Sequence, residues 1–94
     1  MDRHIVIKEF QSMVSEVSKG INPLAVFRKL QQYNLSKVEL MIIDSAIKGM
    51  PLENLYETLI LSADGYNTIL QNLTFKLVEV YQAEAKEQYI RTST

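Results

Sequence analysis

Apolar residues recur along the chain in steps of three and four, the spacing of one face of an α-helix. Such stripes cover residues 4–18, 23–33, 37–48 and 51–59, and a longer stripe runs from 66 to at least 84. No stretch alternates apolar and polar residues for long enough to indicate a strand. The pattern therefore predicts an all-α fold, a compact bundle of four to five helices in which the last helix is the longest.

The same spacing predicts which side chains face the core. Met13, Met41 and Met50 are expected to fill gaps there, since methionine adapts to irregular spaces. The other inward-facing residues are Val6, Phe10, Val14 and Val17 in the first helix, Leu24, Phe27 and Leu30 in the second, Leu40, Ile43 and Ile47 in the third, Leu52, Leu55, Tyr56 and Leu59 in the fourth, and Ile69, Leu70, Leu73, Leu77 and Tyr81 in the last.

Ser36 and Glu39 form the most specific local signal in the chain. A serine at the N-cap and a glutamate three residues later make a capping box, in which each side chain accepts a hydrogen bond from the other residue's backbone N–H. Leu35 and Leu40 occupy the two positions of a hydrophobic staple around this box. A helix is therefore expected to begin directly after Ser36.

Two turns of the chain have nearly the same sequence, a Lys-Gly pair followed by an apolar residue and then Pro-Leu, with Asn22 as one extra residue in the first turn. Gly20 and Gly49 are expected just beyond a helix end, with positive φ. Pro23 and Pro51 are expected to open the helices that follow. The sequence thus predicts two tandem helix-turn-helix units before the long helix. The echo fits either a true repeat or the recurrence of one favourable helix corner.

Asp64 and Gly65 are expected to interrupt the chain before the last helix, because glycine favours turns and aspartate bonds locally. The pattern leaves open whether the helices on either side are continuous. The C-terminal stretch 89–94 is expected to fray. We expect a single domain over residues 1–94, with a folded core at about 4–88.

The composition is that of a small globular protein, with 94 residues, 47% hydrophobic and 22% charged. No apolar run approaches the roughly 18 residues of a membrane span, and no export signal is visible, so we expect a cytoplasmic protein with no membrane contact. The absence of cysteine fits a reducing compartment. The net charge is −1, without the positive excess that attracts nucleic acid.

Groups suited to catalysis are few. His4 is the only histidine, so no second histidine can join it in a metal site. Glu79, Glu84 and Glu87 cluster late in the last helix, where we expect them on its solvated polar side. No phosphate-binding glycine loop and no hydrolase motif occurs. We therefore expect a protein that is not an enzyme, with no catalytic residue, cofactor or metal.

The first helix-turn-helix unit also fits a nucleic-acid-binding function. The helix after Gly20 presents Arg28, Lys29 and Gln32, side chains that can contact phosphates and base edges. The helix after Gly49 presents glutamates, which phosphate would repel. Because Arg, Lys and Gln are also ordinary on a solvated helix face, a small nucleic-acid-binding regulator is the alternative hypothesis.

Phe75 lies off the main apolar stripe of the last helix, near Val78 and Val80. A central last helix would bury this second strip, whereas a peripheral, antiparallel one would leave it uncovered. We favour the uncovered arrangement, in which Phe75, Val78 and Val80 pair with a second copy of the chain and the aromatic ring anchors the contact. The preferred function is therefore a small protein-interaction adaptor or regulator that forms a homodimer.

Overall fold

The computed structural model describes residues 3–19 and 23–93. Those residues form helices and no strand, which confirms the predicted all-α bundle with a long last helix. The last helix continues to Ser93, and the fraying of residues 89–94 stays a prediction. The helices are α1 (Arg3–Lys19), α2 (Pro23–Gln31), α3 (Lys37–Ile47), α4 (Leu55–Thr58) and α5 (Ala63–Ser93).

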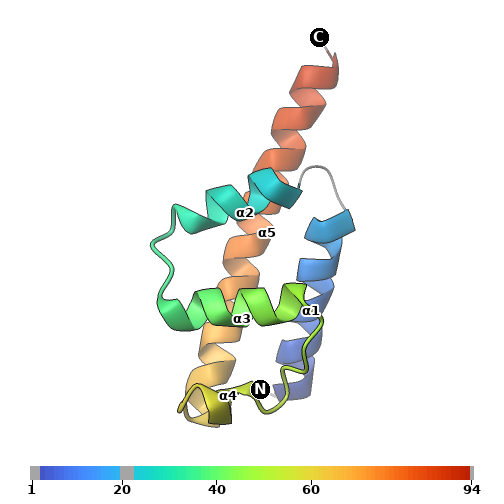
Figure 1. The fold of residues 1–94 in the computed structure, drawn as a ribbon. Coiled ribbons are helices and arrows are strands. Elements are labelled where there is room, and N and C mark those ends of the chain that lie inside the picture. The colour runs from blue at the N-terminus through green and yellow to red at the C-terminus, as the bar shows by residue number, and fades with distance from the viewer. Residues whose placement is uncertain (1–2, 20–22, 94) are drawn as a thin grey trace.

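Helix α5 is the axis of the fold. It lies beside α1, and the two helices run in the same direction (Figure 1). Helices α2 and α3 cross this pair as a second layer, antiparallel to each other (Figure 1). The contacts of α5 are most extensive with α1 and next with α2. The expectation that the last helix is antiparallel is therefore wrong, because α5 runs parallel to α1.

The core forms where the apolar stripe of α5 meets that of α1. The α5 stripe advances in alternating steps of four and three, which keeps its side chains on one narrow seam. The predicted stripe included Ile69 and Tyr81, whereas the buried stripe lies about one position away from them along the helix. These two side chains are therefore only half-buried. The buried residues of α5 include Tyr66, Leu70, Leu73, Leu77 and Val80, and those of α1 are Val6, Ile7, Phe10, Val14 and Val17.

The chain between α3 and α5 is less helical than predicted. No helix opens at Pro51, and only the single turn of α4 forms further along, so the second helix-turn-helix unit is incomplete. Leu52 is nevertheless fully buried, and its carbonyl accepts a hydrogen bond from the Tyr66 hydroxyl at 2.8 Å. Burial, together with the negative charge of Glu53, raises the pKa of Tyr66 to about 12, so the hydroxyl remains a donor.

Helix α5 begins at Ala63, so the predicted interruption at Asp64 and Gly65 is wrong. The Gly65 N–H donates a hydrogen bond to Ser62 Oγ at 3.0 Å, which satisfies one of the free donors at the start of the helix. Asp64 lies in the first turn, where a negative charge is favourable. The true boundary is the turn before Ser62.

Several apolar side chains that were expected in the core lie on the surface. Val26 in α2 and Ile42 in α3 are buried instead, although neither belongs to the predicted inward set. Helices α2 and α3 form an outer layer, so only the side that faces α1 and α5 is covered (Figure 1). The exposed members of the predicted set are Leu24, Leu40, Met41, Ile47 and Met50.

The capping box at the start of α3 is confirmed. The Glu39 N–H donates to Ser36 Oγ at 3.2 Å, and the Ser36 N–H donates to Glu39 Oε1 at 3.1 Å. Glu39 Oε2 also accepts a hydrogen bond from the Lys76 ammonium at 3.3 Å, which ties α3 to α5. Partial burial acts to raise the pKa of Glu39, but the bonds from Ser36 and Lys76 outweigh it and lower that pKa overall.

Left-handed backbone follows three of the helices. Gly49 after α3 has a φ of +74°, as predicted, and Asn34 after α2 has a φ of +55°. Gly20, the other predicted site, lies outside the described residues. Glycine and asparagine adopt this conformation readily.

Ile60, after α4, has a φ of +57°, which is unusual for a β-branched residue. Its N–H donates to the Glu57 carbonyl at 3.2 Å, and the Leu61 N–H donates to the Tyr56 carbonyl at 2.9 Å. These two bonds form a Schellman motif, in which glycine usually holds the left-handed position. Ile60 therefore occupies a strained backbone position.

We predict that Ser36→Ala lowers the free energy of unfolding by about 0.5–2 kcal/mol, because the Glu39 N–H loses its acceptor. Glu39→Ala should not add fully to it, since both side chains belong to one box. The lowered pKa of Glu39 means that its carboxylate stabilises the fold above about pH 4.5 and loses that effect as the pH falls through the folded value. Urea denaturation of the single and double variants at neutral and acidic pH measures both effects, and full additivity would contradict the box.

We predict that Ile60→Gly raises the free energy of unfolding by up to about 1 kcal/mol. Glycine removes the left-handed backbone penalty of roughly 1–2 kcal/mol. Part of this gain is offset, because glycine also increases the conformational entropy of the unfolded chain. Gly49→Ala should do the opposite by about 1 kcal/mol, although an added Cβ would meet no atom within 4 Å. Thermal denaturation compares the two, and a destabilised Ile60→Gly variant would mean that the Ile60 side chain stabilises the fold.

Candidate protein-interaction surfaces

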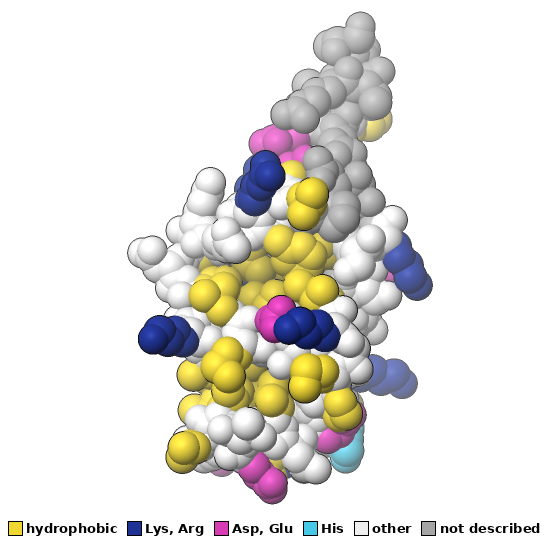
Figure 2. Space-filling model, viewed as in Figure 1, with side chains coloured by type: hydrophobic (Ala, Val, Ile, Leu, Met, Phe, Trp, Pro, Cys, Tyr) yellow, Lys and Arg dark blue, Asp and Glu magenta, His cyan; other side chains and the backbone are white. Residues whose placement is uncertain are grey.

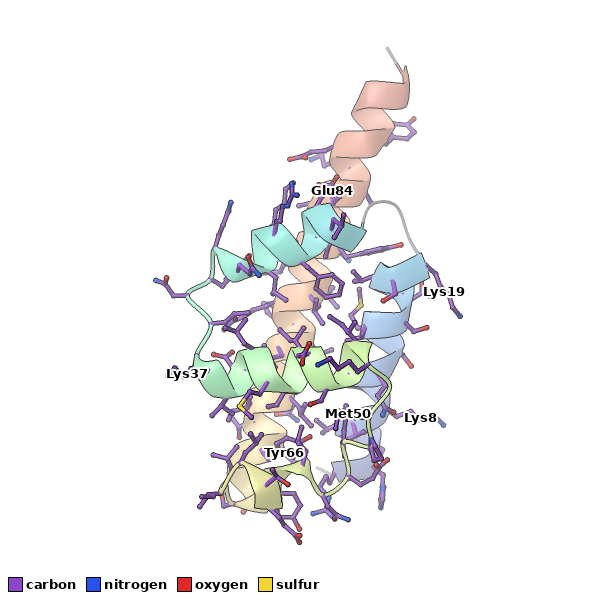
Figure 3. The ribbon with its side chains drawn as sticks, viewed as in Figure 1. Lys8, Lys19, Lys37, Met50, Tyr66 and Glu84 are labelled. Atoms are coloured by element: carbon purple, nitrogen blue, oxygen red, sulfur yellow. The ribbon has the colours of Figure 1, made fainter. Side chains whose placement is uncertain are left out.

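Lys29 on α2 forms ion pairs with two glutamates of α5. Its Nζ lies 2.9 Å from Glu84 Oε2 and 2.8 Å from Glu87 Oε2. Hydrogen bonds with Glu87 and Glu84 raise the pKa of Lys29, so the ammonium stays charged. Glu84 is only 3% exposed and lies where α5 passes α2 (Figure 3), which corrects the expectation that it faces solvent.

These ion pairs bear on the predicted nucleic-acid contacts Arg28, Lys29 and Gln32. Arg28 and Gln32 are exposed, but Lys29 is held by two carboxylates. Tyr33, just after α2, donates a hydrogen bond to Glu79 at 3.2 Å, which adds a third carboxylate nearby. Carboxylates repel phosphate, so this region is poorly suited to a nucleic-acid backbone. The second unit offers no recognition helix, because α4 is a single turn.

A groove follows the contact between α1 and α5, and we call it the α1/α5 groove. Its volume is about 500 Å³, and a smaller hollow of about 230 Å³ adjoins it and shares three of its lining residues. Phe75 lines the smaller hollow and is 65% exposed. The residues that line the larger part are Ile5, Lys8, Glu9, Ser12, Met13, Glu16, Thr74 and Val78.

Only part of the predicted interface strip lies on this face. Phe75 is exposed, and Val78 is half-buried and lines both hollows. Val80 is 4% exposed and belongs to the core, which corrects its assignment to the strip. Positions five apart on a helix point about 140° away from each other, so Phe75 and Val80 do not share a face.

A second apolar hollow, of about 240 Å³, opens between α2 and α3, and we call it the α2/α3 hollow. Apolar side chains gather on the molecular surface between these helices (Figure 2). Leu35 and Leu40, the expected hydrophobic staple, both line it. The other lining residues are Phe27, Leu30, Gln31, Ile43, Asp44 and Ile47.

In the part of the chain that the structure describes, no three histidine, aspartate or glutamate side chains gather in a way that could hold a metal ion. None of the helices described has both the length and the apolar character needed to cross a membrane. His4 lies on the surface.

Comparison with protein-family models, with curated proteins and with solved structures finds no match to this chain.

The burial of Glu84 and the exposure of Ile60 were not predicted from the sequence. The burial of Glu84 has a signal, because continuing the four-three steps of α5 from Leu77 and Val80 reaches position 84. The exposure and strain of Ile60 have none, since an isoleucine does not by itself indicate left-handed backbone.

We predict that Lys29→Ala lowers the melting temperature more than Arg28→Ala does. The first change removes a cation 2.9 Å from the buried Glu84 carboxylate, and taking one ion pair from a buried charge lowers stability more than removing an exposed one. Arg28 is exposed and has no ion-pair partner among the described residues. Thermal denaturation followed by circular dichroism compares the two variants, and equal melting temperatures would mean that the Lys29 pairs add nothing to stability.

Proposed function

We propose that the protein is a non-enzymatic interaction domain, an adaptor or regulator that forms a two-fold homodimer through its α1/α5 face. The observation that carries the proposal is Phe75, a large apolar side chain that is 65% exposed at the edge of an apolar groove. A side chain of this size in water is unfavourable, and aromatic residues are common anchors of protein interfaces. The absence of cysteine fits a cytoplasmic setting for this domain.

A second copy is the partner that this face fits best. A two-fold interface uses the same patch on both chains, so the patch must carry both a projection and a matching hollow. Phe75 supplies the projection, and the α1/α5 groove beside it supplies the hollow, with Ile5, Met13 and Val78 on its walls. A half-turn about an axis through this face can thus seat each Phe75 in the other chain's groove.

The charges on this face suit the same arrangement. Lys8 lines the groove together with Glu9 and Glu16, so both signs occur on one patch. Two copies can therefore place unlike charges opposite each other, whereas a patch of one sign would repel its own copy. Nucleic-acid binding remains the second hypothesis, and the carboxylates around Lys29 count against it.

We predict that the protein is a dimer at micromolar concentration and that Phe75→Glu gives a folded monomer, because a buried carboxylate would replace the aromatic anchor. Leu24→Glu is the matched control, since Leu24 is exposed to a similar extent but lies on α2. Sedimentation velocity gives the mass, and circular dichroism checks the fold. At micromolar concentration, a monomeric wild type or a Phe75→Glu variant as dimeric as the wild type would overturn the proposed interface.

A further inference from the structure

Ile60 is the most exposed large apolar side chain among the described residues, at 92%. It stands on the turn between α4 and α5, at the end of the bundle away from the C-terminus (Figure 1). The Schellman bonds to Glu57 and Tyr56 fix the backbone of this turn. Glycine would relieve its left-handed strain and expose less apolar surface. Strain of this kind is characteristic of functional positions, so Ile60 is a candidate contact residue.

The α2/α3 hollow offers a socket for such a side chain. Its volume of about 240 Å³ compares with about 30 Å³ for one water molecule in the liquid, so a four-carbon side chain can enter. Leu40 and Ile47 on its rim are about half exposed. An apolar group seated there would remove both rim residues and itself from water, which is favourable.

Among the described residues, the unpaired charges near the Ile60 turn and those on the two helices that form the hollow are opposite in sign, although Arg28 and Lys37 do not themselves line the hollow. Glu57 and Asp64 flank Ile60, are exposed, and have no ion-pair partner among the described residues. Arg28 and Lys37, on the helices that form the hollow, are likewise exposed and unpaired within the described part of the chain. Asp44, which lines the hollow, is paired with Lys48 at 2.9 Å. The turn before α5 thus carries two unpaired negative charges, Glu57 and Asp64. Helices α2 and α3 carry two unpaired positive charges, Arg28 and Lys37.

We propose that Ile60 of one copy docks into the α2/α3 hollow of a second copy, with Glu57 and Asp64 facing the basic residues of α2 and α3. The turn is at one end of the bundle and the hollow is on its side, so one molecule cannot satisfy both features by itself (Figures 1 and 2). The contact is therefore head-to-tail, and such contacts repeat into an open chain unless the rotation closes a ring. It is separate from the two-fold Phe75 contact and does not depend on it.

This head-to-tail contact is small, so it should be weak and visible only at high concentration. Salt should weaken it further, because its flanking charges are exposed and easily screened. It is best measured in a Phe75→Glu background, where the α1/α5 face no longer contributes.

Two further substitutions in this background separate the two halves of the contact. Ile60→Gly removes the projecting side chain, and Ile47→Glu places a charge in the hollow. Met41→Glu is the matched control, because Met41 is on the same helix as Ile47 and both are 51% exposed, but Met41 does not line the hollow. Circular dichroism checks that each variant is folded.

Sedimentation velocity at increasing concentration should show association of the Phe75→Glu parent and of its Met41→Glu derivative. The Ile60→Gly and Ile47→Glu derivatives should each remain monomeric alone. Mixed in equal amounts, the two derivatives should form a 1:1 complex that grows no further. The Ile47→Glu derivative still supplies an intact Ile60, and the Ile60→Gly derivative still supplies an intact hollow. A two-fold contact gives no such rescue, so the mixture distinguishes this proposal from the Phe75 interface.

A mixture that stays monomeric would overturn the proposal, as would an Ile60→Gly derivative that associates like its parent. A parent that is monomeric at every concentration would also overturn it, and would leave Ile60 as a contact for a different protein.

Discussion

The parallel seam between α1 and α5 is the interaction on which the rest of the molecule depends. The four-three spacing from Tyr66 to Val80 keeps one side of α5 against α1 over several turns. Polar contacts join the helices of the outer layer to α5 at separate points. Helix α2 is joined through the Lys29 ion pairs, and α3 through the hydrogen bond from Lys76 to Glu39. Helices α2 and α3 make few contacts with each other, which is why an apolar hollow remains between them.

Features that depend on neighbours within one helical turn could be predicted from sequence. The box at Ser36 and the left-handed Gly49 are of this kind, since a few adjacent residues supply all the bonds involved. Pro51 shows where local reasoning fails. It suits the first turn of a helix, but Leu52 beside it is buried in a non-helical segment. The Leu52 carbonyl accepts a hydrogen bond from Tyr66, fourteen residues further along, and contacts of this range override a local helix signal.

The candidate surfaces were predictable only in part, for the same reason. Phe75 stands off the α5 stripe whatever the exact position of that stripe, so its exposure follows from spacing. Val80 and Glu84 depend on where the stripe lies to within one residue, and that is set by packing against α1 and α2. The direction of α5 relative to α1 depends on the path of the whole intervening chain, which no local pattern encodes.

Pairing the first helix with the last has a consequence for how the chain folds. The contacts between α1 and α5 are long-range, and long-range contacts slow folding relative to a bundle of neighbouring hairpins. A ribosome adds about 5–20 residues per second, so α1 is synthesised seconds before α5. During that time Phe10 and Val14 of α1 lack the helix that covers them in the folded protein. Helices α2 and α3 cross α1 with far less contact and cannot replace α5. The nascent chain therefore carries bare apolar surface until its last helix is synthesised.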